Sequence, residues 1–201
     1  MTSAETRSGR AAPMSPEARR SAIIDAVVPL LRRHGRTVTT RQIAEGAGIA
    51  EGTIFRVFDS KEDLVEAALT RAFDPRAFFR GLAEIDPGQP LRDRLVALVS
   101  LLQSRFIDIF TLMNAVGLVA PPDHDPEEPA VIEARARIRT VLLGLVEPDA
   151  AALRISTDLL LHVLRLLTFS GSHTHISDHH LLTPDEIVDV VLNGALIHPK
   201  D

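Results

Sequence analysis

Helical periodicity runs through almost the whole chain. In the first such segment Ile23, Ala26, Val27, Leu30 and Leu31 recur every three or four residues, which is the spacing of one helix face. No stretch alternates apolar and polar residues between hairpin turns, as a half-buried strand would. The sequence therefore predicts an all-α fold of about nine helices, with breaks that contain proline or glycine.

Local signals mark where the first helices start. Ser15 before Pro16 is a favourable N-cap followed by proline at the first helical position, so a helix should run from Pro16 to about His34, bent at Pro29. Thr39 and Gln42 fit a capping box. This box should open a second, short helix that ends near Ala47.

A turn and two further helices follow. Gly48 tolerates the positive φ of a tight turn, a third helix should cover residues 50–58, and Ser60 should cap a fourth. Later helices are expected at 91–118, 128–146 and 148–170, with a last one starting at Thr183. We expect a flexible arm at 1–14, a helix-turn-helix domain at 15–60, and a ligand-binding and dimerisation bundle at 61–201.

Charge and composition narrow the function. The net charge is −5, but residues 1–60 hold nine arginines against six acidic residues, an asymmetry typical of a chain that meets a polyanion at one end. The absence of cysteine excludes disulfides, thiolate metal sites and cysteine nucleophiles. The first residues lack the apolar core of a signal peptide, and no apolar run reaches the ~18 residues of a membrane span. We expect a soluble cytoplasmic protein with no membrane partner.

The predicted helix at 148–170 is apolar over most of its circumference, with its charged and imidazole side chains on one narrow stripe. Such a helix is typically buried on two sides, against its own domain and against a second subunit. The alternative is the central helix of a monomeric bundle. The predicted homodimer interface comprises Leu160, Leu164, Leu167, Val188, Val191 and Leu192.

Residues 39–61 read TTRQIAEGAGIAEGTIFRVFDSK, and they carry the strongest functional pattern. Ala44 is small where two helices cross, Gly48 makes the turn, and Ile54 anchors the second helix in an apolar seam. The seam is expected to be completed by Ile43, Ile49, Phe55 and Phe58. Together with the capped flanking helices, this segment resembles the DNA-binding segment of the TetR family of bacterial transcription regulators.

The resemblance covers about residues 16–66, and it implies that the helix at 50–57 enters the major groove of operator DNA. Thr53 and Arg56 would face the bases, and Gly52 would allow close approach of the sugar-phosphate backbone. Thr40, Arg41 and Lys61 lie at helix starts, where phosphates commonly bind. The full predicted DNA-binding set is Thr40, Arg41, Ala50, Glu51, Gly52, Thr53, Phe55, Arg56 and Lys61.

Four positions depart from the family pattern. Ala50 stands where Ser or Thr caps the reading helix, a loss of ~1 kcal/mol, and Phe55 and Val57 lack polar groups that contact phosphates. Glu51 should be repelled by phosphates unless it accepts a hydrogen bond from a cytosine amino group. Arg7 and Arg10 on the arm are candidates for compensating contacts in the minor groove.

The resemblance also implies a ligand cavity in the later helices. Its predicted walls are the apolar Leu98, Leu102, Phe106, Phe110 and Met113, with Arg105 and Asn114 as polar contacts. Such a lining suits a small hydrophobic effector, and ordinary core packing is the alternative role of each residue. The sequence identifies neither the effector nor the operator.

A histidine-rich loop is the remaining feature. His173, His175, His179 and His180 lie close in sequence with Asp178 among them, so the loop is either an exposed segment, a zinc or nickel site, or a group that charges near pH 6. We expect no bound metal, no cofactor and no enzyme activity. The predicted function is a homodimeric repressor that a hydrophobic effector releases from a palindromic operator. The alternatives are a helical interaction module with a degenerate helix-turn-helix and a metal-dependent enzyme built on these histidines.

Overall fold

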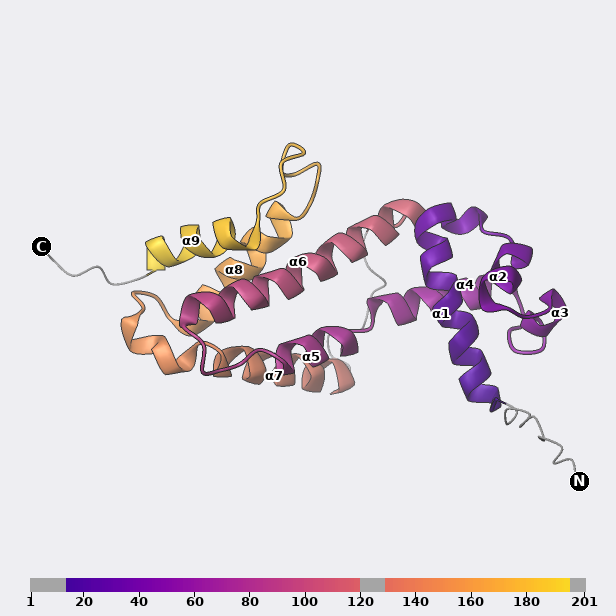
Figure 1. Ribbon diagram of the computed structural model, residues 1–201, viewed down its shortest axis with the longest axis horizontal. Coiled ribbons are helices and arrows are strands. Elements are labelled where there is room, and N and C mark those ends of the chain that lie inside the picture. Colours follow the sequence, from indigo (N-terminus) through magenta and orange to yellow (C-terminus); the bar gives the residue numbers. More distant parts are fainter. Residues whose placement is uncertain (1–13, 120–128, 196–201) are drawn as a thin grey trace, which may run out of the picture. The chain divides into compact units, whose positions relative to one another are not determined.

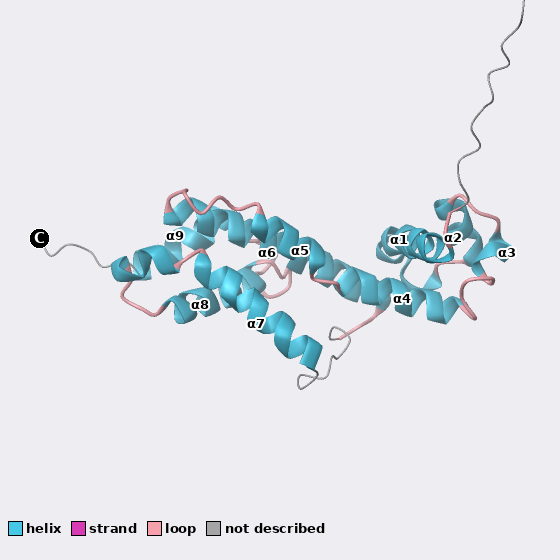
Figure 2. Ribbon diagram, turned by 90° about the horizontal axis from the view of Figure 1, so that it is seen from below, coloured by secondary structure: helices cyan, strands magenta, loops and turns pink. Residues whose placement is uncertain are grey.

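The computed structural model describes residues 14–119 and 129–195, and within these ranges the chain contains helices and loops but no strand (Figures 1 and 2). This confirms the predicted all-α class. The chain divides into two compact units, residues 1–71 and 72–201. The predicted arm, except for Met14, and its Arg7 and Arg10 lie outside the described residues.

The first unit starts with the long helix α1. Its N-cap is Ser15, whose Oγ accepts a hydrogen bond from the backbone N–H of Ala18 at 3.1 Å, and the helix runs on through Pro29. The predicted start and end of this helix are confirmed. The elements of the unit are α1 (Pro16–His34), η1 (Gly35–Thr37), α2 (Thr40–Ala47), α3 (Glu51–Ile54) and α4 (Lys61–Phe73).

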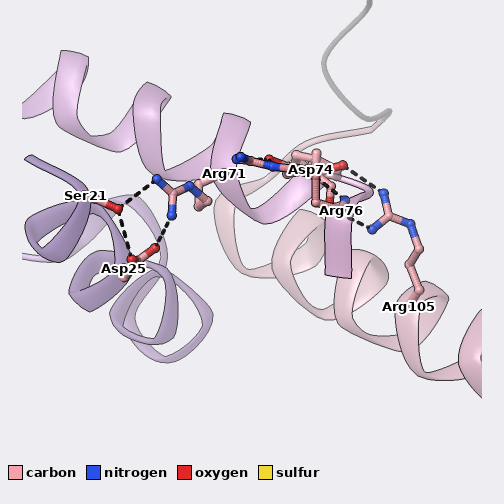
Figure 3. Close-up of polar contacts among 7 residues, drawn as sticks. Ser21, Asp25, Arg71, Asp74, Arg76 and Arg105 are labelled. Atoms are coloured by element: carbon pink, nitrogen blue, oxygen red, sulfur yellow. Dashed lines mark hydrogen bonds and ion pairs between the residues drawn. The ribbon is translucent and has the colours of Figure 1, made fainter. Parts of the chain in front are cut away.

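Each α-helix of this unit contributes fully buried side chains to its core: Ile23, Val27 and Leu31 from α1, Ile43 from α2, Ile54 from α3, and Leu64 and Ala68 from α4. On α4, Arg71 donates hydrogen bonds to Asp25 at 2.7 Å and to Ser21 at 3.1 Å, both on α1 (Figure 3). Arg71 on α4 is thus joined to α1 within the first compact unit, which runs to residue 71.

In the second unit, α6 is the central helix, because it contacts α5, α8 and α9 (Figure 1). The helices are α5 (Arg76–Ala83), α6 (Leu91–Val116), α7 (Pro129–Gly144), η2 (Glu147–Ala152), α8 (Thr157–Gly171) and α9 (Pro184–Ala195). The last one starts with a capping box, because the Thr183 hydroxyl accepts from the Glu186 N–H and the Glu186 carboxylate accepts from the Thr183 N–H. The core includes Phe78, Leu82, Leu95, Leu98, Val99, Leu160, Leu164, Ile187 and Val188.

Two arginines fix the start of α6. Arg94 is buried, donates to the carbonyl oxygen of Leu145 at 2.8 Å and pairs with Asp149. Arg92 pairs with Asp185 at 2.9 Å and Asp189 at 2.8 Å on α9. The pKa of Asp189 is lowered, mainly by its hydrogen bond from Arg92.

The predicted helix at 148–170 is wrong in its first third. The chain forms the short 3₁₀ helix η2, turns extended at Leu153, and starts α8 only at Thr157. The reason is the N-cap Ser156, which starts α8 later than the apolar periodicity indicates. Ser156 has extended backbone dihedrals, and its Oγ accepts from the N–H of Leu159 at 3.2 Å.

By length and composition alone, α6 is apolar enough to cross a membrane, although charged residues interrupt its apolar run. The packing of α6 is nevertheless that of a bundle helix. It contacts three other helices of its unit, and Arg94 and Arg105 on it donate hydrogen bonds to backbone carbonyl oxygens.

Candidate nucleic-acid interface

The segment from Thr39 to Phe58 forms a helix-turn-helix. The predicted capping box is present, since the Thr39 hydroxyl accepts from the Gln42 N–H at 3.2 Å and the Gln42 side chain accepts from the Thr39 N–H at 2.9 Å. Helix α2 ends at Gly48, which has φ 64° and ψ 34°. This left-handed conformation is strained for residues with a Cβ, so glycine makes the tight turn into α3 possible.

The second helix of this motif, α3, is shorter than predicted. It covers Glu51–Ile54, and the chain continues in turns whose N–H groups, from Val57 and Phe58, donate to the Ile54 carbonyl oxygen at 2.9 and 3.0 Å. Ala50 occupies the N-cap without a side-chain hydrogen bond, as expected for alanine. Ile54 is fully buried and Phe58 is buried, so both hold α3 against the core as predicted.

The outer surface of α3 and the following turn is open. Glu51, Gly52, Phe55 and Arg56 are exposed and Thr53 is half-buried. Phe55 is 53% exposed, so its predicted place in the apolar seam is wrong. The backbone turns after Ile54, and Phe55 caps the short helix instead of continuing its buried face. A Cβ at Gly52 would meet nothing within 4 Å, which leaves room for the backbone of another molecule.

The predicted phosphate-binding residues all have partners within the chain. The Thr40 hydroxyl donates to the Glu51 carboxylate, Arg41 pairs with Glu45 at 3.0 Å, and the Lys61 ammonium donates to the Arg36 carbonyl oxygen at 3.0 Å. Arg41 and Glu45 are 80% and 65% exposed, so this ion pair is weak and competes little with a phosphate. Lys61 keeps two of its three protons for a further acceptor.

Sequence reasoning missed two contacts at this surface. One is the link from Thr40 on α2 to Glu51 on α3, and the other is the Arg20 guanidinium, 4.8 Å from the ring centre of Phe58. The paired residues are far apart in sequence, and neither pair has the three- or four-residue spacing that marks a contact along one helix. No sequence signal identifies such pairs.

The predicted effector residues lie along α6. Leu98 is buried in the core, Asn114 is exposed, and the remaining five are half-buried. The rings of Phe106 and Phe110 meet the ring of Phe169 on α8 edge to face, with centroids 5.4 and 5.0 Å away.

Arg105 also lies on α6, and it donates to the carbonyl oxygens of Phe73 at 2.8 Å and Asp74 at 3.2 Å, where α4 ends (Figure 3). Burial lowers the pKa of Arg105.

A cleft of about 370 Å³ opens between α5 and α6. It is lined by Gly81, Glu84, Ile85, Asp86, Gln89, Ala97, Ser100, Leu101 and Ser104. None of the predicted effector residues is among them. The cleft and the predicted residues therefore occupy different faces of α6.

Most of the predicted dimer-interface residues are core residues of their own unit. Leu160, Leu164 and Val188 are fully buried, and Val191 and Leu192 are each 7% exposed, so these five side chains offer little surface to a partner. Leu167 is half-buried. The large apolar side chains that α8 and α9 do expose are Leu159, Val163, Leu166, Phe169 and Val190.

The histidine-rich loop packs ring against ring. His173 contacts Phe110 at 4.6 Å between centroids, and its ring is followed by those of His175 at 6.0 Å and His179 at 5.6 Å. Within the described ranges, no group of three His, Cys, Asp or Glu residues is placed to hold a metal ion.

Known proteins resemble the chain most clearly in its first unit. The sequence model described as "Bacterial regulatory proteins, tetR family" matches residues 23–68. The HTH-type transcriptional regulator YvkB of Bacillus subtilis is 50% identical over 50 residues, which cover 24% of this chain and 26% of that protein. The HTH-type transcriptional repressor KstR2 of Rhodococcus jostii is 36% identical over 83 residues, 41% of this chain and 40% of that protein.

The likeness in fold extends further than the likeness in sequence. A solved structure of a TetR-family protein from Vibrio parahaemolyticus superposes with a TM-score of 0.58 at 17% identity, covering 90% of this chain and 100% of that one. At this identity the match shows the fold alone, a helix-turn-helix joined to a helical bundle. The curated relatives are matched over less than half of their own length.

Proposed function

We propose that this chain, whose residues 23–68 match the sequence model of the tetR family of bacterial regulatory proteins, is a homodimeric repressor of that family, released from a palindromic operator by a small hydrophobic effector. As a DNA-binding regulator in a bacterium it would act in the cytoplasm. KstR2, one of its matched relatives, is named a repressor.

Operator binding rests on one observation above all. A capped α2, a left-handed turn at Gly48 and a short α3 with a buried Ile54 present an outer face on which Gly52 and Arg56 are exposed. This is the geometry with which a helix-turn-helix places its second helix in the major groove. The test is selection from random DNA duplexes with the full chain, from which one inverted repeat should be recovered.

Homodimerisation is supported by the apolar surface of α8. Leu159, Val163 and Leu166 are spaced along one face of the helix and are each more than a third exposed. Contiguous exposed apolar side chains of this kind mark protein interfaces. Sedimentation at micromolar concentration should show a dimer. Its two reading helices should then fit half-sites about one helical turn, ~34 Å, apart or a related spacing.

The effector proposal rests on the half-buried apolar side chains of α6. The rings of Phe106 and Phe110 pack edge to face against Phe169, and Arg105 on the same helix donates to the carbonyl oxygens at the end of α4. A ligand that displaces α6 would therefore act on the helix that leads to the DNA-binding unit. A hydrophobic compound should raise the melting temperature and weaken operator binding, because it stabilises the state that does not bind DNA.

The selection experiment also separates the alternatives. Recovery of no sequence even at low salt would favour an interaction module with a degenerate helix-turn-helix. An effector that binds while operator affinity stays unchanged would refute the release mechanism but leave the repressor intact.

A further inference from the structure

Glu51 is an anionic residue on the face of the chain that should meet DNA. It is exposed, and it is the first residue of the reading helix α3. We propose that Glu51 reads a base, its carboxylate accepting a hydrogen bond from the amino group of a cytosine in the major groove, once in each half-site. This inference rests on the proposed operator binding and adds to it a specific base preference.

The position of Glu51 in the fold supports a base contact. In a helix-turn-helix, the residues at the N-terminal end of the second helix contact the base edges. Gly52 follows directly and has no side chain to shield its neighbour, and a Cβ there would meet nothing within 4 Å. The carboxylate thus stands at the end of α3 that enters the groove.

The carboxylate is held in place from the preceding helix. The Thr40 hydroxyl on α2 donates a hydrogen bond to Oε1 of Glu51, which leaves Oε2 to accept from another donor. A hydroxyl has a single proton, so Thr40 in this arrangement cannot also donate to a phosphate. In this proposal Thr40 positions Glu51 instead of binding a phosphate.

Within the described part of the chain, the negative charge of Glu51 is not neutralised by a neighbouring cation. The nearby Arg41 pairs with Glu45 instead. An unpaired carboxylate among phosphates is repelled, which weakens binding unless a hydrogen-bond donor on the DNA compensates for the repulsion.

Cytosine presents such a donor in the major groove and carries no acceptor of its own on that edge. Adenine adds the N7 acceptor beside its amino group, and guanine and thymine present acceptors where a carboxylate would have to approach. Cytosine is therefore the base that Glu51 should select.

The test is competition binding of the full-length chain to the selected operator, with all four bases substituted at each half-site position. The parent should prefer cytosine at one position by about tenfold. In Glu51→Gln the preference should move to adenine, because a glutamine amide pairs with both N6 and N7 of adenine. Thr40→Val, which keeps the shape but removes the donor, should weaken the preference for cytosine without moving it to another base.

The matched control is Glu45→Gln, which removes an exposed carboxylate on α2 and should leave every base preference unchanged. If Glu51→Gln instead binds all sequences more tightly by one common factor, Glu51 is merely repelled by phosphates and the inference is overturned. It is also overturned if Glu51→Gln and Thr40→Val lower the melting temperature alike while the base preferences stay as in the parent. If the parent recovers no inverted repeat at low salt, the proposed function fails and this inference with it.

Discussion

Replacing Lys61 by Ala should weaken operator binding equally for all sequences and flatten its salt dependence. Lys61 starts α4, and its ammonium is fixed by the Arg36 carbonyl oxygen at 3.0 Å, with two protons left for a phosphate. Each phosphate contact contributes ~0.9 to the slope of log affinity against log salt, so a dimer with two such lysines loses ~1.8. Between 50 and 200 mM salt, the affinity of the parent should therefore fall about twelvefold more than that of the variant.

Fluorescence anisotropy of a labelled operator at several salt concentrations measures this slope. Lys61→Arg should keep the parent slope because it keeps the charge. Arg135→Ala removes an equal charge from an exposed position on α7 in the second unit, and its slope should also match the parent. A parent-like slope in Lys61→Ala, or a change in its base preference, would refute the placement of this lysine at a phosphate.

Val163→Glu should dissociate the dimer in sedimentation with little loss of monomer stability, since Val163 is 36% exposed. Leu164→Ala removes a fully buried side chain, so it should lower the free energy of unfolding by ~2–5 kcal/mol in denaturant titration. Equal effects of the two on stability would contradict the proposed interface. Ala50→Ser should restore the missing cap of α3 and stabilise the chain by ~1 kcal/mol, seen as a higher melting temperature. Arg92→Gln should lower the free energy of unfolding, because it removes the partner that lowers the pKa of Asp189. Above pH 3.8, the usual pKa of this carboxyl, the difference from the parent should be constant. It should vanish as the pH falls through the lowered pKa that Asp189 has in the folded parent. A difference that persists in acid would contradict this pairing.

The helix-turn-helix unit was predictable in much of its detail because its signals are local. A cap joins residues three apart, as in Thr39 with Gln42, and the turn at Gly48 depends on the backbone of that residue alone. Phe55 was placed wrongly in the seam because its exposure depends on the chain leaving the helix after Ile54. Periodicity, which assumes that a helix continues, does not report that departure.

The sequence by itself determined that this chain is helical, where α1, α2 and α9 begin, and that residues 39–61 contain a helix-turn-helix. Each of these depends on neighbours within about one helical turn. The tertiary structure decided which apolar face of α8 turns inward, since Leu160 is buried beside an exposed Leu159 on a helix that is apolar on both sides. It also paired Thr40 with Glu51 and brought Arg105 to the end of α4. Those contacts join residues that are distant in sequence, and they exist only once the helices pack, so no periodicity in the chain records them.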